Sequence, residues 1–364
     1  MSSVRANKGI ERIKLHMVDG ASLPAPPTAI ALNSNESVFG PGPYARAAAR
    51  AAVNGIERYL EFPDTLLTPV IANRFGLAED RITVGQGSDD LLARLARTYL
   101  GPETELLRSA NGYLKVPNYA HANNAAVVSV PDDNFKPSVE RMINALSDRT
   151  RLVYLANPEN PAGTYLSGKE IRRLHRAMPD NALLVIDSAY EEYVDAADYE
   201  PSHNLVDSAD NIVMCRTLSK IFGLAGARVG WMYGPKEIVD TIRRVGLTFP
   251  IASPSAAAAI AALEDTAHTE FVYQANLNGR KWLTLALEKL GLEIVPSQAN
   301  FILVHFPDAN RSAISAHEYL RQNGIAVRRF ASPAFDDYIR ITIGHDRDLR
   351  ATRNCISDFL NGPA

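Results

Sequence analysis

Residues 216–230 read RTLSKIFGLAGARVG and directly follow the short apolar run at residues 212–215. This stretch places one amine, Lys220, after threonine and serine hydroxyls and before a glycine-rich turn that ends in the cation Arg228. The apolar run predicts a buried strand, so the amine would lie near the carboxyl end of that strand. Hydroxyls, glycine amides and a fixed cation suit a bound phosphate, and an amine beside them suits a covalent imine.

The composition of the 364 residues is that of an ordinary globular protein, with 46% apolar and 22% charged side chains. A chain of this length can bury one large core and one smaller core, which predicts two unequal domains. The formal net charge of −3 argues against a nucleic-acid or membrane-surface partner, because either would favour a basic face. Residues 1–15 contain no secretory h-region, and no apolar run reaches the roughly 18 residues of a membrane span.

Cysteine usage points to a reducing compartment, and histidine spacing argues against a metal site. The two cysteines, Cys215 and Cys355, are too few for a disulfide framework or a zinc cluster. The eight histidines show no ligand spacing, so we expect no metal site. Together with the absence of a signal, these features predict a cytoplasmic enzyme or binding protein.

Short β-branched runs alternate with longer amphipathic segments along much of the chain. The runs expected to be strands are 82–84, 105–107, 127–130, 152–156, 183–186 and 212–214. Helix-like stretches lie between them, among them residues 167–177 with Ser167 as the predicted cap. This alternation predicts a mainly parallel, doubly wound α/β sheet with helices on both faces.

The later part of the chain indicates a second domain. A long periodic stretch over residues 254–290 is expected to carry the chain away from the sheet, and further strands follow near 301–304, 326–328 and 338–343. The expected organisation is an N-terminal arm that packs on the small domain (1–44), a large domain (45–250) and a small C-terminal α/β domain (251–364).

Unusual residues follow the expected strands. In a doubly wound sheet, ligands bind beyond the carboxyl ends of the strands. The candidates that follow successive strands are the turn at residues 85–89 with Gly87, Ser88 and Asp89, then Tyr113, Asn160, Asp187, Tyr190 and Lys220. The glycine-rich turn opens a helix whose free amides and dipole suit a phosphate. An anion cradle, an aromatic ring, an amide, a carboxylate, a phenol and an amine are thus expected at one edge.

This set resembles the pyridoxal 5′-phosphate-dependent aminotransferases of fold type I, and most closely their histidinol-phosphate aminotransferase branch. The resemblance runs from about residue 31 to residue 344. It rests on six motifs in order: Asn33–Glu36, Gly85–Asp89, Asn157–Gly163, Asp187–Tyr190, Ser219–Arg228 and Arg340–Gly344. It implies a large cofactor-binding domain with a smaller α/β domain, a homodimer with shared active sites, and a role in amino-acid biosynthesis.

The resemblance assigns roles to the residues around the cofactor ring. Lys220 would hold pyridoxal 5′-phosphate as a Schiff base and, once displaced, move the proton between the substrate Cα and the cofactor. Asp187 would pair with the pyridinium nitrogen, so that the ring accepts the electrons of a carbanion. Tyr190 and Asn160 would hydrogen-bond the phenolic oxygen, and Tyr113 would stack on the ring.

The resemblance also implies the anion-binding residues. The expected phosphate ligands are the amides of Gly87, Ser88 and Asp89, the hydroxyls of Thr217 and Ser219, the Arg228 guanidinium and, from the neighbouring subunit, Tyr59. Arg340 would bind the carboxylate or phosphate of the substrate in bidentate fashion, with Arg328 and Asn35 as further substrate-side residues.

The substrate and the reaction class stay open at this point. Residues 17–24 contain no tyrosine where the family usually has a Pro-Tyr pair, and Val116 stands where a second aromatic is common. The amino donor is therefore an L-amino acid or a histidinol-phosphate-like amine, which reacts with a 2-oxo acid in a ping-pong cycle. The same cofactor also supports decarboxylation and elimination, so a decarboxylase or lyase is the alternative enzyme.

Two readings outside this enzyme class fit less well. A cofactor-sensing module of a transcription regulator would need a winged-helix domain ahead of the scaffold, and only about thirty residues precede Asn33. A dinucleotide-binding oxidoreductase would need a third glycine after Gly85 and Gly87, and Asp90 occupies that position.

Overall fold

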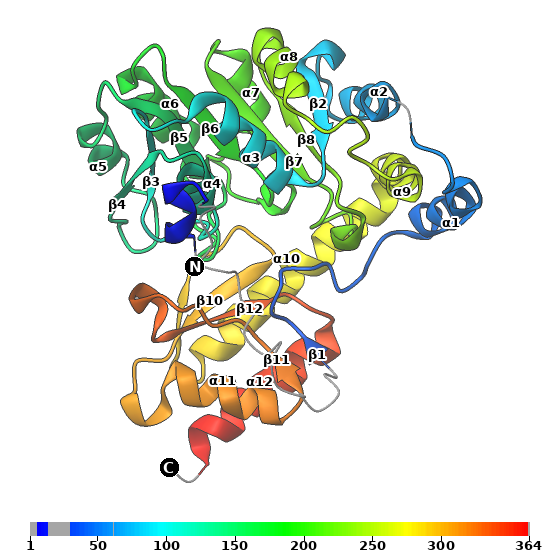
Figure 1. The fold of residues 1–364 in the computed structure, drawn as a ribbon. Coiled ribbons are helices and arrows are strands. Elements are labelled where there is room, and N and C mark those ends of the chain that lie inside the picture. The colour runs from blue at the N-terminus through cyan, green and yellow to red at the C-terminus, as the bar shows by residue number, and fades with distance from the viewer. Residues whose placement is uncertain (1–5, 14–29, 61, 363–364) are drawn as a thin grey trace, which may run out of the picture.

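The computed structural model describes residues 6–13, 30–60 and 62–362, which form two bodies joined by one long helix (Figure 1). The larger body contains a seven-stranded sheet. Its strands, in spatial order, are β2 (Ile82–Gly85), β8 (Gly230–Tyr233), β7 (Ile212–Thr217), β6 (Leu183–Asp187), β5 (Thr150–Ala156), β3 (Glu105–Ser109) and β4 (Ala126–Val130). β8 pairs antiparallel with β2 and β7, and the pairs from β7 to β4 are parallel.

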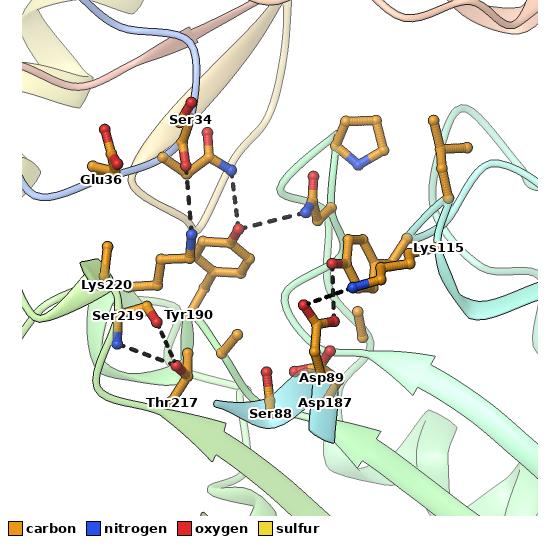
Figure 2. Close-up of a pocket in the computed structure, with 18 of the residues that line it drawn as sticks. Ser34, Glu36, Ser88, Asp89, Lys115, Asp187, Tyr190, Thr217, Ser219 and Lys220 are labelled. Atoms are coloured by element: carbon orange, nitrogen blue, oxygen red, sulfur yellow. Dashed lines mark hydrogen bonds and ion pairs between the residues drawn. The ribbon is translucent and has the colours of Figure 1, made fainter. Parts of the chain in front are cut away.

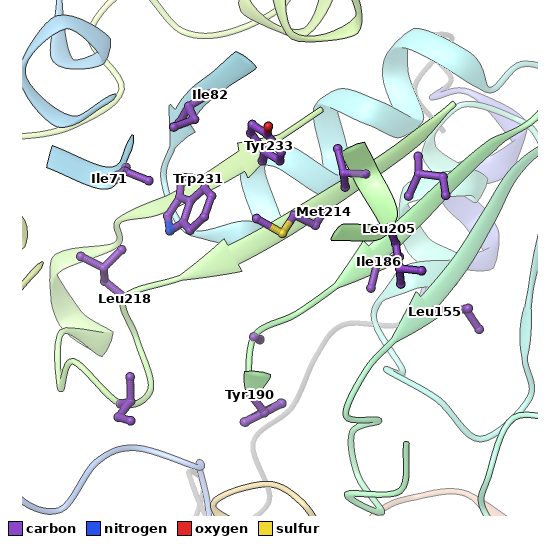
Figure 3. Packing of buried hydrophobic residues seen from close by; sticks show 14 of the residues in the cluster. Ile71, Ile82, Leu155, Ile186, Tyr190, Leu205, Met214, Leu218, Trp231 and Tyr233 are labelled. Atoms are coloured by element: carbon purple, nitrogen blue, oxygen red, sulfur yellow. The ribbon is translucent and has the colours of Figure 1, made fainter. Parts of the chain in front are cut away.

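Helices cover both faces of this sheet because each central strand contributes to two cores. On β5, Leu152, Tyr154 and Ala156 belong to one apolar cluster, whereas Val153 and Leu155 belong to the other. The first face is covered by α3 (Ser88–Tyr99), α4 (Val116–Ala122) and α8 (Lys236–Arg244). The second face, shown in Figure 3, is covered by α2 (Pro63–Phe75), α5 (Val139–Asn144), α6 (Gly168–Ala177) and α7 (Ser202–Asp207).

Two helix boundaries show how local residues set the fold. The predicted Ser167 cap is present, because its Oγ accepts the Glu170 N–H at 3.4 Å and the Glu170 side chain returns the bond in a capping box. The stretch expected over 254–290 is instead two helices, α9 (Ser253–Glu264) and α10 (Thr266–Glu288). Asp265 separates them, since its ψ of 76° leaves the helical region and its carboxylate accepts the His268 N–H at 3.0 Å.

The large body extends past residue 250, where the sequence placed its boundary. α9 packs against α1 (Pro43–Ala52) and α2. Its Ala256, Ala259 and Leu263 lie in the same core as the strands of the large sheet. The chain therefore leaves the large body along α10 rather than before α9.

The smaller body is built on an antiparallel sheet. Its strands, in spatial order, are β12 (Tyr338–Thr342), β10 (Phe301–His305) and β9 (Glu293–Val295). The helices α11 (Ala313–Gln322) and α12 (Asp346–Asn361) pack on it with the second half of α10. Short 3₁₀ helices connect other elements: η2 (Val53–Gly55), η3 (Glu79–Arg81), η4 (Glu191–Tyr193), η5 (Ala225–Ala227), η6 (Ala309–Arg311) and η7 (Pro333–Phe335). No described helix is long and apolar enough to cross a membrane.

The N-terminal segment is divided between the two bodies. β1 (Ile30–Ala31) pairs in parallel with β11 (Ile325–Ala326) of the small body. The 3₁₀ helix η1 (Lys8–Arg12) instead contacts α4 of the large body, where the Gly9 N–H donates to Asn124 Oδ1 at 2.9 Å. Residues 6–13 therefore do not pack on the small domain as expected for the arm. The rest of the arm before β1, including the stretch that lacks the Pro-Tyr pair, lies outside the described residues.

Residues 33–40, which follow β1 and which we call the crossing segment, pass the large body at the loop that follows Lys220. Gly223 in this loop has a φ of +68°, and a Cβ there would lie 2.2 Å from the carbonyl carbon of Gly40. Both the backbone conformation and the contact therefore require glycine. This crossing keeps residues 33–36 close to Lys220, whose Nζ lies 3.5 Å from the Ser34 carbonyl oxygen.

We predict that Gly223→Ala lowers the free energy of unfolding by about 1–3 kcal/mol, because the new methyl group displaces the crossing segment and strains the backbone. Gly226→Ala in the same loop is the matched control, since a Cβ there meets no atom within 4 Å. The control should change stability by less than about 0.5 kcal/mol. Urea denaturation of both variants measures the difference, and equal stabilities would contradict the proposed contact.

Candidate active site

A cavity of about 430 Å³ lies beyond the carboxyl ends of the central strands, between the large sheet and the small body (Figure 2). Thirteen of the fifteen candidate residues line it: Asn35, Ser88, Asp89, Tyr113, Asn160, Asp187, Tyr190, Thr217, Ser219, Lys220, Arg228, Arg328 and Arg340. Gly87 and Tyr59 do not line it. The parallel topology thus brings the strand-end residues together, as expected for a doubly wound sheet.

Lys220 extends into the cavity from the loop after β7 (Figure 2). Its Nζ lies 5.7 Å from the centre of the Tyr190 ring and close to the backbone at Ser34. The Tyr190 hydroxyl accepts a hydrogen bond from Asn35 Nδ2 at 2.9 Å and a longer one from Asn160 Nδ2 at 3.5 Å. Four separate segments of the chain therefore meet around this amine.

Asp187 is the last residue of β6 and is only 5% exposed. Its Oδ2 accepts the Tyr154 hydroxyl at 2.9 Å, whereas its Oδ1 is buried without a hydrogen-bond partner. Burial raises the pKa of Asp187 to about 6, although the Tyr154 hydrogen bond and the Lys220 cation act in the opposite direction. The carboxylate thus keeps one oxygen available for a cationic N–H donor.

The expected phosphate site lies between β7 and the start of α3. Thr217 Oγ1 donates to Ser219 Oγ at 2.8 Å, and Arg228 Nη1 donates to the same oxygen at 3.1 Å. Arg228 has a left-handed backbone with a φ of +54°, a strained conformation that is typical of functional sites. Gly87 packs against the Arg228 guanidinium. A Cβ on Gly87 would lie 2.5 Å from Arg228 Nη2, so a side chain at this position would displace the cation.

The Asp89 carboxylate is occupied by neighbouring side chains. Its Oδ1 accepts the hydroxyls of Tyr119 at 2.6 Å and Tyr113 at 3.1 Å, and its Oδ2 lies 3.3 Å from Lys115 Nζ. Although burial acts to raise it, the pKa of Asp89 is lowered, because these hydrogen bonds and the lysine charge together outweigh burial. The predicted phosphate role therefore concerns its backbone amide, while its side chain orients Tyr113, the expected ring-stacking residue.

Arg340 from β12 closes the other end of the cavity. Its guanidinium lies between the rings of Phe301 and Phe330, 5.1 and 5.2 Å from their centres. Nη1 donates to Asn160 Oδ1 at 2.7 Å, and Nη2 donates to the Asn33 carbonyl oxygen at 3.0 Å. Its Nε is buried without a partner. The small body thereby reaches the residues that surround Tyr190.

A second guanidinium, that of Arg328, also lines this end of the cavity. The backbones of Arg328 and Arg340 are joined by hydrogen bonds of 3.0 and 2.8 Å. Burial and, to a smaller extent, the neighbouring Arg328 charge lower the pKa of Arg340 to about 10. Two cations that repel each other across a cavity favour an anion between them.

Tyr59 lies away from the cavity, and its role as a phosphate ligand stays a prediction. Its side chain is 75% exposed and stacks on Phe249 with ring centres 4.3 Å apart. Further exposed apolar side chains lie on α1, η2, α2 and the nearby loop, and with Tyr59 and Phe249 we call them the apolar surface: Tyr44, Val53, Ile56, Phe62, Leu66 and Leu247.

Four residues of the site were not identified from the sequence: Tyr154, Lys115, Tyr119 and Phe330. Tyr154 had a usable signal, since it precedes Ala156 by two positions and therefore shares a face of the sheet with that strand end. Lys115, Tyr119 and Phe330 lie outside the predicted strands, and the sequence gave no such signal for them. Among the described residues, no group of three or more His, Cys, Asp or Glu side chains is arranged to hold a metal ion.

The cavity thus joins an amine, a buried carboxylate with one unpaired oxygen and an anion cradle at the carboxyl edge of a doubly wound sheet, an arrangement suited to an enzyme with a phosphate-bearing cofactor. The family model for class I and II aminotransferases matches residues 27–352. The chain is 40% identical over 333 residues to the histidinol-phosphate aminotransferase of Rhodopseudomonas palustris (strain BisB18), with 91% of each chain covered. It is 40% identical over 362 residues to that of Rhodospirillum centenum, with both chains fully covered.

A solved structure agrees with these relatives. The crystal structure of histidinol-phosphate aminotransferase from Sinorhizobium meliloti, in complex with pyridoxal 5′-phosphate, is similar with a TM-score of 0.86 and 27% identity. The alignment covers 92% of this chain and 91% of that one. The chain belongs to the class I and II aminotransferases. The predicted α/β fold of type I and the predicted class of enzyme, an aminotransferase, are confirmed.

The raised pKa of Asp187 predicts how the cofactor-free protein responds to pH. A carboxyl whose pKa rises from 3.8 to about 6 on folding binds its proton more tightly in the folded state. Stability is therefore lost as the pH rises from about 4 to about 6, and the deficit persists above that window. Asp187→Asn should remove this loss and raise the free energy of unfolding at pH 8 by about 3 kcal/mol.

Thermal unfolding of the cofactor-free protein at pH 4 and pH 8 tests this expectation. The stabilisation by Asp187→Asn should be large at pH 8 and nearly absent at pH 4, since the wild-type side chain is then largely protonated. Asp240→Asn, in an exposed pair with Lys236 on α8, is the control and should not stabilise. Stabilisation by Asp187→Asn that is equal at both pH values would contradict the buried charge.

Proposed function

We propose that this protein is a pyridoxal 5′-phosphate-dependent aminotransferase that transfers the amino group of histidinol phosphate, or of a closely similar phosphorylated amine, to a 2-oxo acid. Family membership confirms the predicted transamination and cofactor, and nothing favours the decarboxylase or lyase alternative. The observation that carries the proposal is one cavity that joins Lys220 and the unpaired oxygen of Asp187 to two guanidinium groups. The expected cytoplasmic location rests on the sequence composition.

The residues fit the cofactor because Asp187 lacks a partner that a pyridinium N–H would supply. When bound, pyridoxal 5′-phosphate supplies an electron sink for the bond that breaks at the substrate Cα. Thr217, Ser219 and Arg228, with the amides at the start of α3, would hold its phosphate through charge-assisted and neutral hydrogen bonds. Tyr190 would hold the phenolic oxygen, together with Asn160.

Lys220 has two tasks in this proposal. Its Nζ would first hold the cofactor at the aldehyde carbon and, once the substrate amine takes that position, would carry the proton away from the substrate Cα. The crossing segment limits where this amine can go, because Ser34 lies directly beside it. The same amine would deliver that proton to the cofactor, and in the second half of the cycle it would carry a proton from the cofactor to the Cα of the 2-oxo acid as that acid takes up the amino group.

The substrate assignment rests on the cationic end of the cavity and on the names of the relatives. Histidinol phosphate carries a phosphate and no carboxylate. A phosphate dianion balances the charges of Arg328 and Arg340 better than a single carboxylate does. The Nε of Arg340 has no hydrogen-bond partner, while its other nitrogens are held by Asn160 and Asn33.

We predict that kcat/KM for histidinol phosphate exceeds that for histidinol by roughly a hundredfold or more, because histidinol offers no anion to the two guanidinium groups. Arg328→Met should lower kcat/KM for histidinol phosphate by about tenfold to a hundredfold and should have little effect on histidinol. Arg350→Met on α12, which removes an exposed guanidinium paired with Asp346, is the control. Equal rates with both amines would contradict the substrate assignment.

We also propose that the protein is a homodimer whose sites are shared. The apolar surface gathers eight exposed large apolar side chains, and a second copy of the chain would cover them. Tyr59 lies on this surface rather than near its own cavity. We propose that it enters the cavity of the partner, as the family resemblance implies.

Mixing two variants, each of which has little activity at low cofactor concentration, tests the shared site. Lys220→Ala should abolish turnover, and Tyr59→Ala should weaken phosphate binding in the partner's cavity. A mixed dimer of the two variants has one cavity with both Lys220 and the partner's Tyr59 intact. After subunit exchange, activity should rise toward about a quarter of the wild-type value at low cofactor concentration, because half of the dimers are mixed and carry one intact site. No recovery in dimers shown to be mixed would contradict shared sites.

A further inference from the structure

Tyr154 is the one side chain in the described structure that hydrogen-bonds an oxygen of Asp187. On the neighbouring strands β5 and β6, Ala156 is the register partner of Asp187, and Tyr154 is the partner of Val185. Tyr154 is therefore the diagonal neighbour of Asp187 on the same face, a separation that an aromatic side chain spans. The residue directly opposite Asp187 is the small Ala156.

We propose that Tyr154 is a positioning residue for the ring nitrogen of the cofactor: it holds Asp187 by one oxygen, keeps it ionised and leaves the other oxygen for the pyridinium N–H. This inference rests on the proposed function, because it assigns the free oxygen of Asp187 to the cofactor. Tyr154 lines the cavity but is 97% buried, with 3% of its surface exposed. Its phenol therefore acts through Asp187 rather than on the substrate.

The direction of the hydrogen bond supports this role. Burial raises the pKa of Tyr154 well above its ordinary value, so the phenol keeps its proton and donates it. A donated hydrogen bond favours the ionised form of Asp187 against the effect of burial. The backbone N–H of Ala189 and the cation of Lys220 act in the same direction.

Of the groups that favour the ionised form of Asp187, Tyr154 has the largest effect. Other neighbours oppose ionisation. Asp89 at the start of α3 repels the carboxylate. The other titratable neighbours that interact electrostatically with Asp187 are Tyr113 after β3, Tyr119 on α4, Glu159 in the turn after β5 and Cys215 on β7. Among the side chains, Tyr154 is thus the hydrogen-bond donor that offsets burial. Removal of its hydroxyl should therefore raise the pKa of Asp187.

Tyr154→Phe should weaken equilibrium binding of pyridoxal 5′-phosphate by roughly tenfold, because Asp187 then favours its neutral form. The acid limb of the kcat profile should move upward by about one pH unit for the same reason. Replacement of Tyr154 by 3-fluorotyrosine, a stronger donor of similar size, should move the limb downward. Opposite shifts from these two variants distinguish a positioning role from lost packing.

Tyr233→Phe is the matched control, since its hydroxyl donates to Asp207 Oδ1 at 2.7 Å, away from the cavity. This control removes the same type of hydrogen bond and should leave cofactor binding and the pH profile unchanged. If Tyr154→Phe keeps wild-type binding and pH dependence while Asp187→Asn loses cofactor affinity, the inference is wrong and the proposed function stands. If Asp187→Asn also binds the cofactor normally, the free oxygen of Asp187 does not hold the ring nitrogen, and the inference is overturned together with that part of the proposed function.

Discussion

The buried carboxylate of Asp187 is the constraint on which the active site depends. An ionised carboxylate with an unpaired oxygen is unfavourable in a protein interior, and the raised pKa of Asp187 records that cost. The fold tolerates it because the sheet around it is otherwise apolar and well packed, as the alternating residues of β5 and β6 show. A ligand with a cationic ring nitrogen removes the penalty that any other ligand leaves in place. The buried carboxylate of Asp187 thus favours ligands with a cationic ring nitrogen over neutral ones.

The two ends of the cavity are parts of one hydrogen-bond network. Asn160 donates to Tyr190 beside Lys220, and its carbonyl oxygen accepts from Arg340 of the small body. Asn35 also donates to Tyr190, and its Oδ1 accepts the Thr342 hydroxyl from the same strand as Arg340. An anion that binds Arg340 therefore acts on groups that orient the cofactor end. Binding energy from the remote phosphate of a substrate can in this way contribute to the alignment of the reacting atoms.

The sequence predicted those parts of the fold and site that depend on strand periodicity and chain order. Residues at strand ends meet in any doubly wound sheet, so Asp187, Asn160 and Lys220 could be grouped without coordinates. Features that depend on packing between distant segments were missed or misplaced. The short antiparallel strand β8 was not predicted, and η1 lies on α4 rather than on the small body. Tyr154 reads as a core residue until the register shows that its hydroxyl meets a carboxylate.

The buried ionisable groups differ in whether a partner neutralises them. Arg216, at the end of β7, lies 2.5 Å from Glu192 and is also paired with Glu191, so this buried cation is matched and joins the loop of Lys220 to the turn after Asp187. Glu159 is buried as well, and burial raises its pKa to about 8, so it is largely neutral at pH 7. Asp187, with a pKa of about 6, stays ionised at that pH and keeps one oxygen free. Of these carboxylates, only that of Asp187 faces the cavity, which is where a cationic ligand can satisfy it.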